Sequence, residues 1–347
     1  MARLYVALLA TSLVHVSQSL PQVVVDTDIG SDFDDTWAVT YLLSRSDPAD
    51  PSRLFNFSLI QCSNFNTTAR ALIATKLLFD VDRFDVPVAV GEFTGVNPMP
   101  QLPVVGDWTL DDFTAAGGTL LYGTGALTAL LAAATPSTPL FVVEIAPATS
   151  FGGVVGADPA LASNAIVSAM SGSVYRGYNN NSTPQPEYNV VQNVSASQRM
   201  YAATYLSPMM TAPLDTSGLL HCFAPEFTAL IAADNDEHPY AQALLKNYRV
   251  WCGCTPSPAK GTDTLYDAQA AVMVAQYAQE WVAHGSAPPP VRNLTLQALR
   301  LAVNDSGFTV VDPAAQTVWA AVGFPDGLAA DTHGICQDLI SHIIRAK

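Results

Sequence analysis

Five aspartates lie within a stretch of ten residues near the start of the chain: Asp26, Asp28, Asp32, Asp34 and Asp35. Carboxylates this close together repel one another unless a cation neutralises them, and such hard oxygen donors suit Ca²⁺ or Mg²⁺. The spacing therefore predicts a divalent-metal site. The alternative is a solvated acidic loop whose last aspartates favour the start of a helix.

Two other metal or phosphate motifs resemble this segment only in part. The twelve residues from Asp26 to Trp37 match the length of an EF-hand loop, but Ser31 and Trp37 replace its glycine and its bidentate glutamate. A strand that ends in Asp-x-Asp is also typical of haloacid-dehalogenase-type phosphotransferases. That interpretation leaves Asp34 and Asp35 without a role.

The aspartates follow three valines and precede a helical pattern, so we expect them at the carboxyl end of a buried first strand. Predicted strands are Gln22–Asp26, Phe57–Cys62, Val86–Val90, Leu140–Ile145, Ala165–Met170 and Leu206–Thr211. Predicted helices are Asp34–Ser44, Thr67–Phe79, Gly123–Ala134, Ser195–Tyr205 and Leu265–Trp281. This alternation indicates a single α/β domain, with a doubly wound, largely parallel sheet and helices on both faces. Ligands bind such sheets at the carboxyl ends of the strands.

The last part of the chain predicts further strands and a final helix. These are Val291–Leu296, Phe308–Val311, Val318–Val322 and, near the end, Asp331–Arg345. Three segments rich in Gly, Pro and polar residues predict long loops, where binding sites often lie. They are Gly91–Thr109, Ser171–Glu187 and Thr255–Thr264.

The composition narrows the class of partner. Of 347 residues 49% are hydrophobic, enough for a sizeable core. The 30 acidic residues outnumber the 15 basic ones, which gives a formal charge of −15. This balance argues against binding nucleic acid or an anionic membrane, because both require clustered Lys and Arg. No run after the N-terminus is long and uncharged enough to span a bilayer.

Residues 1–19 predict a secretory signal peptide, which leaves 20–347 as the catalytic domain. Arg3 supplies a positive start and Leu4–Val16 an apolar stretch; a buried N-terminal strand or helix is the alternative. Asn-x-Ser/Thr triplets agree with a secreted, extracellular glycoprotein. They begin at Asn56, Asn66, Asn180, Asn181, Asn193, Asn293 and Asn304.

Five cysteines allow one or two disulfides in an oxidising compartment and leave at least one unpaired. They are Cys62, Cys222, Cys252, Cys254 and Cys336. A zinc site is the weaker alternative for Cys252 and Cys254, because no second pair with matching spacing accompanies them.

The order of several motifs resembles the nucleoside hydrolases, the inosine–uridine-preferring family of N-ribohydrolases. The acidic segment after the valines looks like the N-terminal signature of that family. Later similar steps are Ser63-Asn64, Val86-Pro87-Val88-Ala89-Val90-Gly91, Ala146-Pro147-Ala148-Thr149, the run from Asn181 to Asn189, Pro213-Leu214-Asp215 and Tyr266-Asp267. The resemblance runs from about Val23 to Asp267, and it implies the nucleoside hydrolase fold.

The resemblance also implies a role for particular residues. A Ca²⁺ ion would be bound by Asp28, Asp35, Asp267 and the main-chain carbonyl of Ile145, with Asp26 supporting these ligands. Asp28 would also be the base that takes a proton from the metal-bound water. The ribose hydroxyls would be held by Asp34, Asn64, Asn181, Glu187 and Asn189. Because a glycan on Asn181 would block the pocket, we expect Asn181 to be buried and unmodified, and Asn180 to be unmodified.

Tyr266 departs from the family pattern, which often has a histidine that protonates the departing base. A phenol has an unperturbed pKa near 10 and is a weaker acid. Two explanations stay open. Tyr266 is the acid, or aromatic side chains such as Tyr175, Tyr178 or Trp251 stack on the base, which favours purine nucleosides. His221, His238, His284 and His333 are the remaining candidates for the acid.

The resemblance implies a Ca²⁺-dependent hydrolase that splits ribonucleosides into ribose and free base, and the predicted signal peptide places it outside the cell, where it would act in nucleoside salvage. The resemblance also implies a homodimer or homotetramer. The alternative is a catalytically silent, calcium-stabilised protein that binds a nucleoside or ribose on the same scaffold. A metal-dependent phosphotransferase is a third hypothesis, which depends on the Asp-x-Asp step alone.

Overall fold

The computed structural model describes residues 20–284 and 291–347, so the predicted signal peptide lies outside the described residues. Within them the strands form one sheet in the order β4-β3-β2-β1-β5-β6-β7-β10-β8-β9. The strands are β1 (Gln22–Thr27), β2 (Asn56–Cys62), β3 (Val88–Val90), β4 (Leu120–Tyr122), β5 (Leu140–Ile145), β6 (Ala165–Ala169), β7 (Met210–Thr211), β8 (Thr295–Val303), β9 (Thr309–Val311) and β10 (Thr317–Gly323). Strands β1 to β7 and β10 run parallel, whereas β8 runs antiparallel to both β10 and β9.

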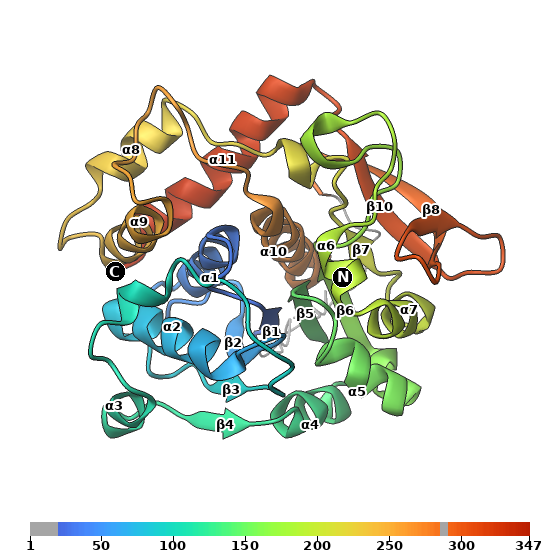
Figure 1. Ribbon diagram of the computed structural model, residues 1–347, viewed down its shortest axis with the longest axis horizontal. Coiled ribbons are helices and arrows are strands. Elements are labelled where there is room, and N and C mark those ends of the chain that lie inside the picture. Colours follow the sequence, from blue (N-terminus) through green and yellow to red (C-terminus); the bar gives the residue numbers. More distant parts are fainter. Residues whose placement is uncertain (1–19, 285–290) are drawn as a thin grey trace, which may run out of the picture.

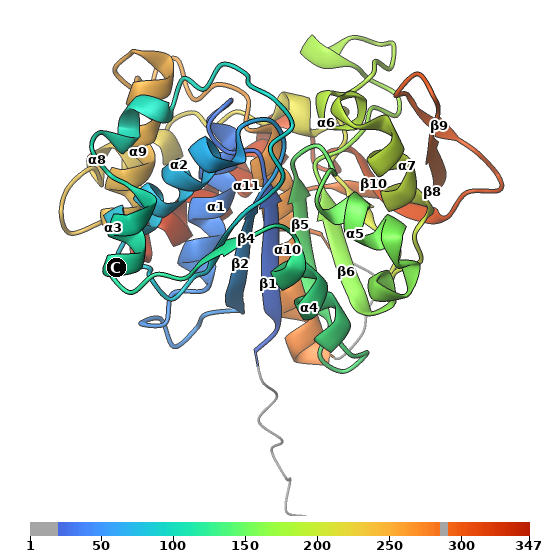
Figure 2. The ribbon, with the colours of Figure 1, turned by 60° about the horizontal axis from the view of Figure 1, so that its bottom comes forward.

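Helices pack on both faces of the sheet (Figure 1). They are α1 (Asp34–Arg45), α2 (Thr67–Asp80), α3 (Leu110–Ala115), α4 (Gly125–Ala133), α5 (Phe151–Ala157), α6 (Tyr188–Gln192), α7 (Val194–Ala202), α8 (Glu226–Ala232), α9 (Pro239–Cys252), α10 (Tyr266–His284) and α11 (Leu328–Arg345). Figure 2 shows α1 and α2 on one side of the central strands and α4 and α5 on the other.

The three valines of β1 explain how the sheet is covered. Successive side chains of a strand point to opposite faces. Val23 and Val25 belong to the core under α1 and α10, whereas Val24 belongs to the core under α5 and α7. A strand with apolar residues on both faces has to lie inside the sheet, between two layers of helices. The predicted doubly wound, largely parallel fold is therefore confirmed.

The order of the strands places a crevice beside β1. The chain builds β2, β3 and β4 on one side of β1 and then crosses to β5 on its other side. At such a switch point the connections leave in opposite directions, and ligands bind there, outside the carboxyl ends of the strands. The acidic segment after β1 and the end of β5 both lie at this point.

Several boundaries differ from the predicted ones. The strand expected at Val291–Leu296 is β8, which runs from Thr295 to Val303, so that prediction was wrong for most of its length. The strand expected at Leu206–Thr211 is reduced to Met210 and Thr211. Helix α9 was not predicted, although Pro239 at its start and an apolar stripe from Tyr240 to Tyr248 are typical helix signals.

Two disulfides connect the C-terminal half of the chain, and Cys62 stays free and buried. Cys222 pairs with Cys336, which ties the segment before α8 to α11. Cys252 pairs with Cys254, so the zinc alternative for this pair was wrong. In residues 20–284 and 291–347, no helix is long and apolar enough to cross a membrane.

Candidate active site

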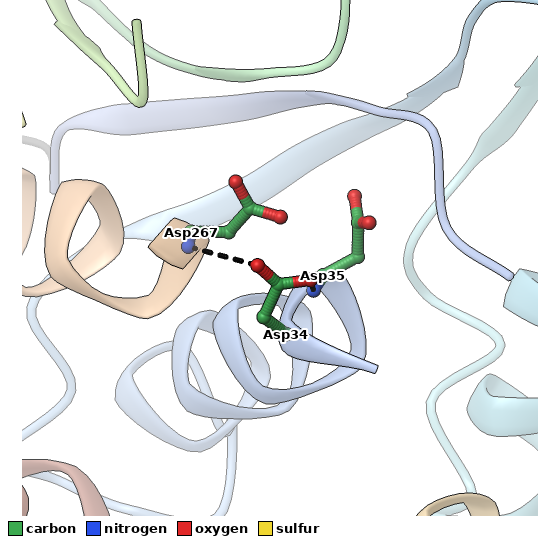
Figure 3. A group of neighbouring side chains, drawn as sticks. All are labelled: Asp34, Asp35 and Asp267. Atoms are coloured by element: carbon green, nitrogen blue, oxygen red, sulfur yellow. Dashed lines mark hydrogen bonds between the residues drawn. The ribbon is translucent and has the colours of Figure 1, made fainter. Parts of the chain in front are cut away.

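Three buried carboxylates meet at the carboxyl edge of the sheet. Asp34 and Asp35 begin α1, and Asp267 lies in the first turn of α10, more than 230 residues later (Figure 3). One carboxylate oxygen from each residue lies within 4.8 Å of the others. Each side chain is 5% exposed or less. This arrangement is the kind of oxygen-rich group that holds a divalent cation.

Hydrogen bonds fix the carboxylates of Asp34 and Asp35 and tie the main chain of Asp267 to them. The main-chain N–H of Asp267 donates to Asp34 Oδ2 at 3.4 Å, which joins the starts of the two helices (Figure 3). The N–H of Asp35 donates to Asp34 Oδ1 at 3.1 Å, and the Thr27 hydroxyl donates to Asp35 Oδ1. Thus Asp34 connects the helices, whereas Asp35 is held by the end of β1.

Gly30 allows the chain to turn between β1 and α1. Its φ is +113°, a backbone conformation that favours glycine. A Cβ atom at this position would lie 2.6 Å from Ile73 Cδ1 of α2 and 2.8 Å from Met99 Cε. The acidic loop therefore packs directly against α2 and the loop after β3, and this close contact sets where its carboxylates lie.

Burial and then mutual repulsion raise the pKa of each of these carboxyl groups. For Asp34 and Asp267 the pKa lies well above its ordinary value, because the groups are buried and face other aspartates. The pKa of Asp35 is raised by burial and by the charge of Asp28. A divalent cation would remove this repulsion and stabilise the ionised forms. The residues present thus fit a bound divalent metal.

The carboxylates form the floor of a cavity of about 600 Å³. The predicted site residues that line it are Asp28, Asp34, Asp35, Ile145, Glu187, Asn189, Tyr266 and Asp267. They come from the ends of β1 and β5, from the starts of α1 and α10, and from the loop before α6. The structure therefore brings together most of the residues that the sequence placed in one site.

Asp28 lies at the cavity but outside the group of three. Its Oδ2 accepts an ion-pair contact from Arg70 Nη2 at 3.3 Å. The Arg70 side chain is fully buried, and it also donates from Nε to the Asn64 carbonyl at 2.7 Å. From Nη1 it donates to the Ile29 carbonyl and to Ser31 Oγ, each at 3.1 Å. One guanidinium therefore orients Asp28 and also fixes the loops that carry Asn64 and Ser31.

We expect Arg70→Lys to lower kcat/KM at least tenfold, because an ammonium cannot reproduce four donor contacts in a planar fork. Steady-state kinetics on the purified variant measures this effect. Arg83→Lys is the matched control. Arg83 is also a buried arginine, and it donates to Asp85 and to the Leu43 carbonyl away from the cavity. It should lower Tm without lowering kcat/KM; equal losses in both variants would contradict the role of Arg70.

Asp26 lies beneath the cavity and does not line it. It accepts hydrogen bonds from the Ser63 hydroxyl and from the Phe151 N–H at 3.0 Å. Burial raises its pKa to about 7. A carboxyl group in this position connects β1 to the neighbouring loops. It is not placed to attack a substrate, which argues against the phosphotransferase hypothesis.

Glu187 and Asn189 stabilise the start of α6 beside the cavity. Glu187 accepts main-chain hydrogen bonds from Asn189 at 2.7 Å, Gly172 at 3.1 Å and Val190 at 3.2 Å. Burial raises the pKa of Glu187 to about 7. The Asn189 amide donates to the Met170 carbonyl at 3.1 Å. Both side chains are therefore fixed where they face the cavity.

Three asparagines were predicted for the ribose site; Asn189 lines the cavity, whereas neither Asn64 nor Asn181 does. Asn64 is buried with φ +65°, it lies beside Asp28, and its Nδ2 has no hydrogen-bond partner among the described residues. By contrast, Asn181 is exposed and does not line the cavity, so the expectation that it is buried was wrong. Its Oδ1 accepts a hydrogen bond from the Thr183 N–H at 3.1 Å within its own loop.

Aromatic side chains cover one side of the cavity. Phe65, Tyr178, Tyr188 and Tyr266 line it, and the rings of Tyr178 and Tyr266 lie edge to face at 6.3 Å. Of the three stacking candidates only Tyr178 is among the lining residues. Trp251 packs instead against Phe33, at 4.4 Å between ring centres. No histidine is among the described residues that line this cavity.

Four residues that build the site received no individual role from the sequence, although Asp32 was counted among the clustered aspartates and Asp215 within a family motif. Arg70 orients Asp28, and Asp215 accepts from the Val174 and Tyr175 N–H groups and so orders the loop that ends at Glu187. Asp32 and Asn97 also line the cavity. Two features of the sequence could have pointed to Arg70 and Asn97. Arg70 is an arginine on the apolar face of α2, and Asn97 belongs to the polar loop after β3.

A family model described as the inosine-uridine preferring nucleoside hydrolase matches residues 23–324 of the chain. This match covers every residue of the cavity described above. The chain belongs to the inosine–uridine preferring nucleoside hydrolase family. Members of this nucleoside hydrolase family split N-glycosyl compounds and use a divalent metal, in agreement with the group formed by Asp34, Asp35 and Asp267. No curated protein matches the chain in sequence.

Solved nucleoside hydrolases share the fold at low sequence identity. A plant nucleoside hydrolase and an inosine–guanosine nucleoside hydrolase each give a TM-score of 0.67 at 14% identity, over 92% of this chain and 99% of theirs. A purine-preferring ribonucleoside hydrolase from Gardnerella vaginalis gives a TM-score of 0.64 at 14% identity, over 93% of this chain and 99% of its own. At this identity the likeness establishes the fold, which the nucleoside hydrolase family model had already indicated.

Proposed function

We propose that this protein is a secreted, Ca²⁺-dependent ribonucleoside hydrolase that yields ribose and a free base. The observation that carries the proposal is the buried group of Asp34, Asp35 and Asp267 on the floor of a cavity in a nucleoside hydrolase chain. A cavity of about 600 Å³ accommodates a ligand the size of a nucleoside. Ca²⁺ suits the site because its donors are carboxylate and carbonyl oxygens.

Asp28 is the general base in this proposal. When bound, Ca²⁺ would lower the pKa of a water molecule and orient it for attack. Asp28 takes the proton as the water oxygen bonds to the anomeric carbon and the N-glycosidic bond breaks. The positive charge of Arg70 stabilises the ionised form of Asp28, and the ion pair holds the Asp28 carboxylate at the cavity. Asp35 and Asp267, with the carbonyl of Ile145, would hold the metal, and Asp26 would support them from below.

The ribose is held by the polar groups between the metal group and α6. Asp34, Glu187 and Asn189 line the cavity and offer acceptors and donors to its hydroxyls, and Asn64, beside Asp28 just outside the lining, supplies a further amide group. Bond cleavage develops positive charge on the sugar, in an oxocarbenium-like state. The surrounding carboxylates stabilise that charge more strongly than they stabilise the neutral substrate, and this difference lowers the barrier.

The leaving base receives its proton from Tyr266 in this proposal. Burial raises the pKa of Tyr266, so its hydroxyl carries a proton at neutral pH. We expect Tyr266→Phe to lower kcat about 10²-fold, the lower end of the effect of a general acid, and to change KM little. The comparison is with Tyr178→Phe, which removes the neighbouring hydroxyl. An unchanged kcat in Tyr266→Phe would show that ring stacking activates the base.

The decisive experiment measures the release of base and reducing sugar from five nucleosides: inosine, adenosine, guanosine, uridine and cytidine. The proposal expects ribose from at least one of them and none after chelation. It also expects purines to be the better substrates, because stacking aids their departure. If a nucleoside binds but no ribose forms, the chain is the silent binding protein.

The secretion part of the proposal is supported by two disulfides and by exposed glycosylation triplets. Cytosolic proteins rarely keep disulfides, so two of them favour an oxidising compartment. Asn56 and Asn304 are exposed triplet asparagines. We expect the protein in the culture medium of its own cells, with a mass that falls after enzymatic removal of N-glycans. Protein retained inside the cell would contradict secretion.

A further inference from the structure

A second cavity of about 600 Å³ lies away from the carboxylates. Much of its lining comes from α1, α10 and α11, three helices that pack against one another (Figure 1). Arg45 at the end of α1, Gln279 of α10, Arg292 in the following turn, and Ser341, His342 and Arg345 of α11 are among its lining residues. Asp34 and Arg45 are the first and last residues of α1, a helix of 12 residues that spans roughly 17 Å. This cavity is therefore separate from the active site.

The cavity concentrates positive charge in an acidic protein. The whole chain has only 15 Lys and Arg residues and a formal charge of −15, yet three arginines line this one space. Cations near helix C-termini are favourable in themselves, which accounts for Arg45 and Arg345 singly. This helix-terminus effect does not account for Arg292, because Arg292 lies in a turn and lines the same cavity.

The carboxylates of this region are already engaged. Asp338 is the only carboxylate among the described residues that line the cavity. It accepts from Gln276 Nε2 at 3.2 Å and faces His342 Nε2 at 3.3 Å. In the adjoining hollow, Asp47 accepts main-chain N–H groups, and Asp50 accepts from Ser52. Within the lining of the cavity itself, three arginines therefore face the single carboxylate of Asp338.

Within the part of the chain that the structure describes, one buried guanidinium group, that of Arg45, has a single donor without a partner, and one exposed group, that of Arg345, has none of its donors engaged. Arg45 is only 9% exposed, and its Nη1 lies 2.8 Å from His342 Nδ1, but its Nε has no hydrogen-bond partner among the described residues. Arg345 makes no ion pair or side-chain hydrogen bond within residues 20–284 and 291–347. A buried donor without an acceptor costs free energy that a bound anion would recover.

We propose that this cavity binds a phosphate group, either as inorganic phosphate or on a small phosphomonoester. A phosphate offers several oxygens to planar guanidinium forks, whereas a single carboxylate offers two. Arg45, Arg292 and Arg345 approach from three segments of the chain, an arrangement that suits a compact, multiply charged anion. The volume leaves room for a sugar attached to the phosphate.

The test is isothermal titration calorimetry of the full chain with inorganic phosphate and, separately, with ribose 5-phosphate. We expect inorganic phosphate, ribose 5-phosphate or both to bind at one saturable site. Which of the two ligands binds shows whether the site takes free phosphate or a phosphomonoester. The double variant Arg292→Gln/Arg345→Gln removes two exposed guanidiniums, so its fold should be kept, as circular dichroism can verify. It should weaken binding at least tenfold and leave kcat for the preferred nucleoside unchanged.

Two controls separate this site from the active site and from general charge. Arg300→Gln removes an exposed arginine of β8 outside the cavity and should leave phosphate binding intact. Asp28→Asn alters the active site and should also leave it intact. The proposal is overturned if neither ligand binds saturably up to 10 mM, about the limit of a weak specific site, or if the double variant binds as tightly as the natural chain.

Discussion

The Asp28→Asn variant is expected to fold normally and to lose kcat by on the order of 10³. The amide keeps an oxygen that can accept from Arg70 Nη2, so the buried arginine retains a partner. It cannot take a proton from water, however, so the attacking oxygen remains a poor nucleophile. Asp28→Ala should show the same loss of kcat and an added loss of stability, because it leaves the Arg70 charge unpaired.

Single-turnover and steady-state kinetics, with thermal unfolding of each variant, separate these effects. Asp47→Asn is the matched control, since Asp47 is also a buried aspartate that accepts main-chain hydrogen bonds but lies far from the cavity. It should lower Tm and leave kcat within about twofold, the scatter expected of a site that does not touch the substrate. If Asp28→Asn kept the natural rate, another group would have to be the base.

Removal of the metal should abolish turnover and lower Tm. Without a cation, Asp34, Asp35 and Asp267 are buried like charges within 4.8 Å, and the apo protein has to protonate them or bear their repulsion. A cation that binds only the folded state adds about 4 kcal/mol to the free energy of unfolding at a thousand times its Kd.

Activity and Tm should therefore both return when Ca²⁺ is added after chelation. Mg²⁺ should restore less, because it demands a tighter octahedral set of ligands. Asp267→Asn should shift the Ca²⁺ concentration that restores half of the activity to higher values, and Asp47→Asn should not. Full activity after exhaustive chelation would contradict the metal site.

The sequence was sufficient to place the carboxylates because they follow a simple pattern. A strand with apolar residues on both faces has to lie inside the sheet, so Asp28, at its carboxyl end, has to lie at the edge where ligands bind. Asp267 is at the start of a long helix, and the family resemblance connected it with a segment far away in the chain. Strand and helix patterns of this kind can be recognised in the sequence alone.

Loop residues were harder to place, because their direction depends on backbone angles that no periodicity reports. Asn179 and Asn180 both have positive φ, +54° and +59°. These two residues turn the chain just before Asn181, whose side chain then bonds within its own loop. Arg70 was missed for another reason. A single arginine on an apolar helix face has no predicted partner until the fold brings four acceptors to it.

The junction of two helix starts has a consequence for how firmly the ion is held. The positive end of each helix dipole, at Asp34 of α1 and at Tyr266 of α10, points towards the place where the cation would bind. The positive end of each dipole repels the cation and attracts the carboxylates. Part of the negative potential of the carboxylates is therefore cancelled before a cation binds. The same three aspartates, held just as rigidly but away from helix starts, would bind the ion more tightly. The fold thus moderates cation affinity, and the ion should exchange with solvent faster than the number of carboxylates alone would suggest.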